Sequence, residues 1–361
     1  MIYFKSKYGI QEIQIRNVAE GEALAARDRN FLEFQVGGPH NIVVSLRNNT
    51  ADEAATRDKI HLFCNVTSRF EPNPRIRSMF ESLVEKRLPE NSSIPAESRD
   101  TYIDDSGALK AIPPLRFLPD NIQEFVGQVV GEHGETANRT VDVLRWRAAR
   151  LGPLNPISSS VFYWSLDEKN WHSFPSRVQT TFNIGPAAVP ISTQLRSEIQ
   201  ALINLEADEP LAHELFREAW AQLGSPNLRS ALIIGVAALE VGVKEFVSAL
   251  VPQAAWLVLE IPSPPVDKML EDYLPDLPTK CTFEGRVLSP PKEILQTLRE
   301  AVHARNVESH RGGTKPLNRN KLTERLLAIR DVLWLLDYYR GHEWALEYVR
   351  EETRAAMSGQ Q

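Results

Sequence analysis

The strongest constraint on the fold is a long apolar stripe between Asn227 and Leu250. Apolar residues recur there at intervals of three and four, which places them on one face of an α-helix. They are Leu228, Leu232, Val236, Leu239, Val243, Phe246 and Leu250. Asn227 is a favourable N-cap, so we expect the helix to begin directly after it. A helix of about six turns with such a face needs other helices to cover it, which predicts a helical bundle in the second half of the chain.

The composition is that of a globular protein with more than one domain. The chain has 361 residues, of which 42% are hydrophobic and 24% are charged, with a formal net charge of −6. Cys64 and Cys281 are the only cysteines, and their separation predicts neither a disulfide framework nor a zinc site. The longest apolar run, 231–243, is interrupted by Glu240 and is too short to cross a membrane. We therefore expect a cytoplasmic protein without membrane contact, metal or cofactor.

The first half predicts a β-rich, mixed α+β domain over residues 1–190. Alternating or β-branched segments indicate strands, and longer segments with helical spacing indicate helices. The expected strands are 10–18, 31–36, 41–46 and 141–146, and the expected helices are 52–70 and 74–88. The aromatic runs 161–166 and 171–174 flank a polar turn and predict a β-hairpin. Its tryptophans are interpreted as core residues, with a base-stacking surface as the alternative.

The second half predicts an all-α domain over residues 191–350. Helices are expected at 193–205, 211–223, 227–250, 266–273 and 318–349, in addition to the segment described next. Their apolar faces should form a core separate from that of the first domain. Residues 351–361 are expected to be a disordered tail.

The segment from Ser289 to Gly313 predicts a helix that carries an unusual charge. Ser289 suits the N-cap, Pro290 the first helical position and Gly313 the end. One face of this helix is apolar through Ile294, Leu298, Ala301 and Val302. Arg305 follows on that face one turn later. An arginine on a core-facing helix needs a partner or a function, because burying an unpaired charge is costly.

Arg305, Asn306 and His310 are the residues of this helix with useful chemistry. An arginine can bind phosphate oxygens through two parallel hydrogen bonds, and a histidine can transfer protons near neutral pH. On one straight helix Arg305 and His310 differ by about 140° and are about 7.5 Å apart along the axis, whereas Asn306 and His310 share a face. If Arg305 and His310 act together, either the helix ends between them or two copies of it face each other.

The run from Arg305 to His310 resembles the R-(x4–6)-H signature of the HEPN superfamily, including the polar residue after the arginine. The resemblance covers about residues 193–350. Part of the superfamily also carries an E-x3-K element, to which Glu240 and Lys244 are similar. Members are helical bundles, and many are dimeric, metal-independent endoribonucleases.

The resemblance implies RNA cleavage that leaves 2′,3′-cyclic phosphate ends. Arg305, Asn306 and His310 would be catalytic, and Arg311 and Lys315 would hold flanking phosphates of the RNA. Glu240 and Lys244 would be substrate-binding residues as well. Bacterial members often act in toxin–antitoxin or antiphage systems. In that context an antitoxin, or a phage or cellular trigger sensed by the first domain, is a further expected partner.

Two other interpretations remain open from the sequence. Glu240 and Lys244 can form an ordinary i, i+4 ion pair, and Arg305 can be a structural residue that pairs with Glu240. The second half would then be a non-catalytic module for dimerisation or for binding a nucleotide or partner.

Residues 299–330 have a local net charge of +5, from eight basic and three acidic residues. This basic strip can contact a phosphate backbone, or it can be an ordinary solvated surface.

Overall fold

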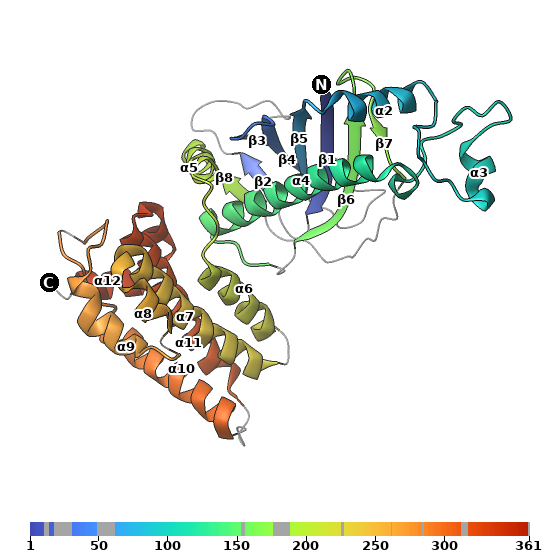
Figure 1. Ribbon diagram of the computed structural model, residues 1–361. Coiled ribbons are helices and arrows are strands. Elements are labelled where there is room, and N and C mark those ends of the chain that lie inside the picture. The colour runs from blue at the N-terminus through green and yellow to red at the C-terminus, as the bar shows by residue number, and fades with distance from the viewer. Residues whose placement is uncertain are drawn as a thin grey trace. The chain divides into compact units, whose positions relative to one another are not determined.

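The computed structural model describes residues 1–10, 14–17, 31–48, 62–152, 156–175, 188–224, 227–260, 262–283, 285–311 and 317–359. The chain forms two compact units. The first, which we call the sheet unit, comprises Met1–Ala148 and Asn155–Asp208, and the second, the helical unit, comprises Ala149–Leu154 and Glu209–Gln361. An antiparallel sheet in the first unit and helices in the second agree with the expected α+β and all-α halves (Figure 1).

The sheet unit is built on six antiparallel strands in the order β3-β4-β5-β1-β6-β7. These strands are β1 (Ile2–Ile10), β3 (Phe31–Val36), β4 (Ile42–Asn48), β5 (Leu62–Phe70), β6 (Ile157–Ser165) and β7 (His172–Ser173). The expected strand 31–36 and the expected hairpin, now β6 and β7, are confirmed. A separate parallel pair joins β2 (Gln14–Asn17) to β8 (Ala188–Ile191).

One face of the sheet is covered by α4 (Asp120–Arg147), which crosses several strands (Figure 1). The period of two in β1 turns Ile2, Phe4, Ser6 and Tyr8 to the buried face. At one end of this core, α2 (Pro74–Val84) adds Phe80, whose ring packs edge-on against Trp164 at 4.8 Å between centroids. Trp164 is fully buried, as the core interpretation of the hairpin requires.

A buried histidine joins α4 to the sheet. The Nδ1 atom of His133 is 2.7 Å from the Ser6 hydroxyl on β1, and its Nε2 atom is 2.6 Å from the Ser68 hydroxyl on β5. A neutral imidazole has one donor and one acceptor nitrogen, so one serine accepts a hydrogen bond and the other donates one. Burial lowers the pKa of His133 to about 4, which keeps the ring neutral at physiological pH.

Two expectations for the sheet unit were wrong. Residues 62–70, expected to be helical, form β5, a central strand paired with both β1 and β4; residues 52–61 of that expected helix lie outside the described residues. Residues 141–146, expected to be a strand, are the last turns of α4. A short apolar run is compatible with a strand and with a helix, and here the contacts with distant segments of the chain determined which one formed. His133, Ala137, Val141 and Leu144 show the helical spacing that a six-residue window could not reveal.

The sheet unit continues beyond the expected boundary at 190 and includes α5 (Thr193–Asn204). This helix packs against α4 and β3. Gln200 bonds to both the amide and the carbonyl of Gln35, and Arg147 of α4 donates to Glu198 over 2.7 Å. The helical character of α5 was predicted correctly, but its apolar face belongs to the core of the sheet unit.

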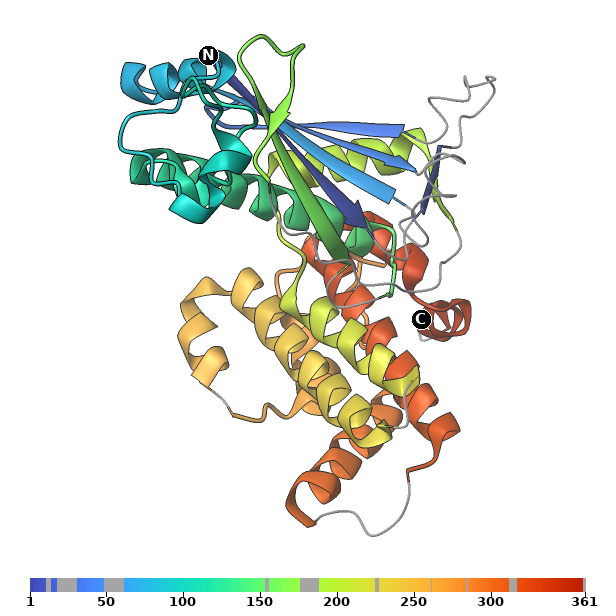
Figure 2. The same cartoon turned by 90° about the vertical axis from the view of Figure 1, so that its right-hand side faces the viewer.

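The helical unit is organised around α7 (Leu228–Leu250), which the apolar stripe predicted. Asn227 caps it by accepting a hydrogen bond from the amide of Ser230. α6 (Leu211–Gly224), α10 (Lys292–Arg311) and α11 (Arg319–Arg340) all pack against α7 (Figure 2). Shorter turns lie between α7 and α10, namely α8 (Ala255–Glu260), α9 (Val266–Lys268), η4 (Met269–Tyr273) and η5 (Leu274–Asp276).

The start of α10 differs from the expectation. Ser289 is not its N-cap, because its hydroxyl donates to the carbonyl of Glu271 over 2.9 Å. The first intrahelical bond runs from the Leu295 amide to the Pro291 carbonyl, so the helix begins at Lys292. The cause is the double proline, since a residue that precedes a proline disfavours the helical conformation and Pro290 precedes Pro291.

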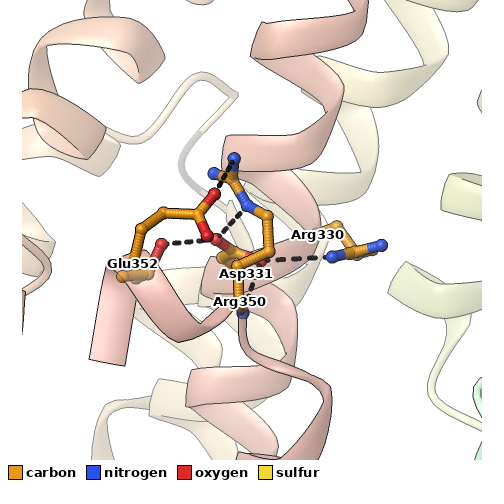
Figure 3. A network of polar contacts seen from close by, with 5 residues as sticks. Arg330, Asp331, Arg350 and Glu352 are labelled. Atoms are coloured by element: carbon orange, nitrogen blue, oxygen red, sulfur yellow. Dashed lines mark hydrogen bonds and ion pairs between the residues drawn. The ribbon is translucent and has the colours of Figure 1, made fainter. Parts of the chain in front are cut away.

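The C-terminal residues form a helix rather than the expected disordered tail. After α11 ends at the left-handed Gly341, η6 (Glu343–Tyr348) leads to α12 (Glu351–Ser358). The buried carboxylate of Asp331 on α11 accepts hydrogen bonds from the Arg350 side chain at 2.7 Å and from Thr353 at 2.6 Å (Figure 3). Met357 is also fully buried. These contacts fix α12 to the bundle.

Within the described part of the chain, no helix combines the length and the apolar character that a membrane span requires.

The packing of α7 gives a prediction for Gly242. A Cβ atom at this position would lie 2.5 Å from Leu333 Cδ2 and 3.2 Å from the Cβ atom of Ala212. The overpacking should lower the free energy of unfolding by about 1–3 kcal/mol, and the better helix propensity of alanine should raise it by about 1 kcal/mol. We expect Gly242→Ala to lower the free energy of unfolding by up to about 2 kcal/mol, measured by chemical denaturation with circular dichroism. Gly127→Ala, at an exposed α4 position with open space around it, should be neutral or stabilising. Equal stability of the two variants would contradict the packing argument.

A second prediction concerns His133 and pH. The pKa of His133 is about 4 in the folded chain and 6.5 in an unfolded one, so the unfolded chain binds more protons between these values. The contribution of the neutral His133 ring to the free energy of unfolding is fully present above pH 6.5 and is lost as the pH falls to 4. At 1.36 kcal/mol per pH unit, this contribution amounts to about 3 kcal/mol. His133→Gln keeps hydrogen-bonding groups but does not titrate. Its unfolding free energy should therefore fall less steeply than that of the native protein over this pH range, and parallel profiles would contradict the assignment.

Candidate functional site

Arg305 lies on the face of α10 that packs against α7, as the sequence predicted. The buried residues Leu295, Leu298 and Ala301 precede it on this face. Its guanidinium forms a hydrogen-bonded ion pair with the carboxylate of Glu240 on α7. Of the two partners that the sequence left open for Glu240, namely Lys244 and Arg305, the structure thus shows the hydrogen bond to Arg305. The side chains are 18% and 13% exposed, respectively. The pair is therefore only partly buried.

Burial has the largest effect on the pKa of the carboxylate in this pair. Burial raises the pKa of the Glu240 carboxyl, and the positive charges of Arg305 and Lys244 act in the opposite direction. Only Nη2 of Arg305 bonds to Glu240, while its buried Nε has no hydrogen-bond partner in the described part of the chain. Arg305 thus keeps donor capacity that Glu240 does not use.

Lys244 lies one turn after Glu240 but has a different hydrogen-bond partner. Its Nζ atom donates to the carbonyl oxygen of Leu259 at the end of α8, over 3.3 Å. Glu240 forms its hydrogen-bonded ion pair with Arg305 on α10. The two residues of the E-x3-K element therefore connect α7 to two different segments, α10 and α8.

A second ion pair joins α7 to α10 and was not foreseen. The Nε atom of Arg229, near the start of α7, is 2.7 Å from Oε2 of the buried Glu308. Glu308 lies one turn after Arg305 on the same side of α10. This partner was not predicted from the sequence, because a pairing between residues so far apart depends on the tertiary fold.

The helix containing Arg305 does not end before His310. The backbone of α10 is helical through Arg311, so Arg305 and His310 remain about 140° apart around one axis. Of the two arrangements that could bring them together, only the one with two copies of α10 remains. The side chain of Asn306 is exposed. The side chains of His310 and Arg311, and the whole of Lys315, lie outside the described part of the structure.

Four of the eight basic residues in the strip at 299–330 have carboxylate partners within the part of the chain that the structure describes. Arg299 pairs with Asp267 and Glu271, which precede the strip in the sequence. Further arginine–carboxylate pairs of the strip are Arg305–Glu240, Arg325–Glu300 and Arg330–Asp331. All of these carboxylates except Glu300 lie outside the window, so counting charges within it missed them. The phosphate-binding interpretation of the strip thus loses about half of its supporting basic residues.

One buried polar pair in the helical unit was also missed. His213 Nε2 on α6 is 2.8 Å from Asp337 Oδ2 on α11, and the ring of Trp334 lies 4.2 Å from the His213 ring. Both members of the pair are buried, so they link α6 to α11 in the core. Among the described residues, no three His, Cys, Asp or Glu side chains are grouped so that they could hold a metal ion.

No protein-family model matches this chain, and comparisons with curated proteins and with solved structures also find no match.

The geometry predicts a measurable coupling between Arg305 and Glu240. For this partly buried pair we expect a coupling free energy of about 1–2 kcal/mol, between the values for exposed and fully buried pairs. A double-mutant cycle of Arg305→Ala and Glu240→Ala, followed by chemical unfolding, measures it. The matched control is Arg325 with Glu300, whose charged atoms are 3.9 Å apart and whose carboxylate is exposed. Its coupling should stay below about 0.5 kcal/mol. A coupling as small for Arg305 and Glu240 would mean that the ion pair does not hold the two helices together.

Proposed function

We propose that this protein is a cytoplasmic, metal-independent endoribonuclease of HEPN type whose active site forms between two copies of the helical unit. The observation that carries the proposal is the position of Arg305 on α10, held by Glu240 of α7 and followed by the exposed Asn306. Arg305 and His310 have the spacing of the R-(x4–6)-H signature on a continuous helix. The link between the E-x3-K segment and the arginine supports treating the two sequence elements as one site.

The proposed chemistry uses the nucleophile that RNA itself carries. His310 accepts the proton of the 2′-OH, the 2′-oxygen forms a bond to phosphorus, and the bond from phosphorus to the 5′-oxygen breaks. The 5′-oxygen leaves with the proton that His310 has accepted, so the products are a 2′,3′-cyclic phosphate and a 5′-OH. Arg305 stabilises the additional negative charge on the phosphate oxygens, and Asn306 orients the phosphate or His310. Arg311 and Lys315 are assigned to the flanking phosphates.

Two copies are required by the continuous helix. A phosphate that contacts both Arg305 and His310 cannot do so from one straight α10, because the two residues point in directions about 140° apart. A twofold axis beside α10 would bring Arg305 of one protomer toward His310 of the other. Glu240 then has a role in the free dimer, since it neutralises an arginine that would otherwise face its own copy.

The sheet unit is proposed to recognise the target or to sense a trigger. Its six-stranded sheet and its separate core make it a distinct module beside the helical unit. The superfamily context suggests an antitoxin, or a phage or cellular component, as the partner that regulates the nuclease.

One observation favours a non-catalytic alternative. The ion pair with Glu240 already satisfies the charge of Arg305, as a purely structural arginine would require. The helical unit would then be a dimerisation module, or a module that binds a nucleotide or partner. Activity measurements separate the two functions, because only the nuclease requires His310.

The nuclease proposal is tested on single-stranded RNA in excess EDTA. The native chain should cleave, and His310→Ala should reduce cleavage at least 100-fold, in the range of a lost general acid or base, without changing the melting temperature by more than a few degrees. His303→Ala is the matched control, because His303 is an exposed histidine two turns earlier on the same helix. Loss of activity in the control as well, or full activity of His310→Ala, would reject the mechanism.

Mixing variants then tests the composite site. A heterodimer of Arg305→Ala and His310→Ala protomers retains one Arg305 and one His310, on different chains. It should recover part of the activity that each variant homodimer lacks. A native chain that is fully active as a monomer would exclude a site shared between two copies.

A further inference from the structure

α8 exposes an unusual amount of apolar surface. Its residues Trp256, Leu257 and Leu259, which we call the α8 patch, are 74%, 60% and 56% exposed. Val258 is the buried residue of this short helix and anchors it. Soluble monomers rarely show several large apolar side chains side by side, and such patches commonly mark interaction sites.

The α8 patch is held in a fixed position on the helical unit. α8 follows directly from a 3-10 turn, η3 (Pro252–Ala254), and packs against α7 (Figures 1 and 2). Its last turn is tied to α7 by the hydrogen bond from Lys244 Nζ to the Leu259 carbonyl. Lys244 is one helical turn from Glu240, the partner of Arg305. The patch therefore borders the candidate site.

We propose that the α8 patch is the apolar centre of the interface between two copies of this chain. The inference rests on the proposed function, because one α10 cannot direct Arg305 and His310 at the same phosphate and a second copy must lie beside it. Within α8 only Glu260 is charged. Such a surface can meet its own copy around a twofold axis without repulsion between like charges.

The exposed area of the α8 patch agrees with a second copy of the chain as its binding partner. Its three side chains expose roughly 400 Å², about half of the ~800 Å² that each partner contributes to a standard interface. The rest has to come from the surface around α8. An interface centred on α8 would place the second copy beside Lys244, one helical turn from Glu240, the partner of Arg305.

Sedimentation equilibrium of the full chain tests the proposal. The native protein should be a dimer at micromolar concentration, and Leu257→Glu should raise the dimer dissociation constant at least 100-fold with unchanged circular dichroism and melting temperature. Leu205→Glu is the matched control, because Leu205 is 77% exposed on the sheet unit and should leave the dimer intact. A dimer that is equally stable in Leu257→Glu would overturn the proposal.

Other occupants of the patch give different results. If the sheet unit of the same chain covers it, the native protein is a monomer and Leu257→Glu lowers its melting temperature. If the patch binds lipid, the native protein sediments with phosphatidylcholine vesicles and remains a monomer without them. Either result overturns the proposal. Dimerisation is measured without RNA, so a dimer that depends on α8 but cleaves no RNA would reject the nuclease and leave the interface standing.

Discussion

The burial of α7 is the constraint on which the helical unit depends. Three helices cover its apolar stripe, and side chains of α6 and α11 approach it closely at two glycines of α7. Gly235 and Gly242 lie where Leu326 and Leu333 of α11 approach closely. These close contacts fix α11 against α7, and α10 takes its place beside both. The orientation of Arg305 follows from this packing.

A charged residue within an apolar helix face strongly restricts which residues can pack against it. Glu240 interrupts the most apolar segment of the chain, and its carboxylate would be costly to bury without a counter-charge. Arg305 supplies that charge from α10, and Arg229 and Glu308 repeat the arrangement with the charges exchanged between the helices. Two pairs of opposite polarity disfavour sliding of α10 along α7, because a shift would bring like charges together. The charged side chains that make this surface a candidate functional site therefore also help to determine how α10 packs against α7.

Local periodicity was sufficient to predict elements whose burial is one-sided. The strand 31–36, the hairpin of β6 and β7 and the helix α7 all follow from patterns within a short window. It was insufficient for β5, whose first three residues are all buried, and for the end of α4, where β-branched residues lie in a helix. For the site, the sequence indicated Arg305 as one of two possible partners of Glu240, because both residues stand out on apolar faces, but it did not decide between Arg305 and Lys244. It did not predict Glu308 or the pairing of the basic strip, since those partners depend on how distant segments meet.

The position of β1 has a consequence for the order in which the sheet unit can be assembled. β1 is the first strand along the chain, yet it lies in the interior of the sheet between β5 and β6. During synthesis both its edges lack a partner until the chain has passed Phe70, and one edge until it has passed Ser165. An unpaired apolar strand is a template for aggregation. Lys5 and Lys7, which alternate with Phe4, Ser6 and Tyr8, place positive charges on one side of this strand. These charges therefore disfavour pairing of the nascent strand with other chains before β5 and β6 have been synthesised.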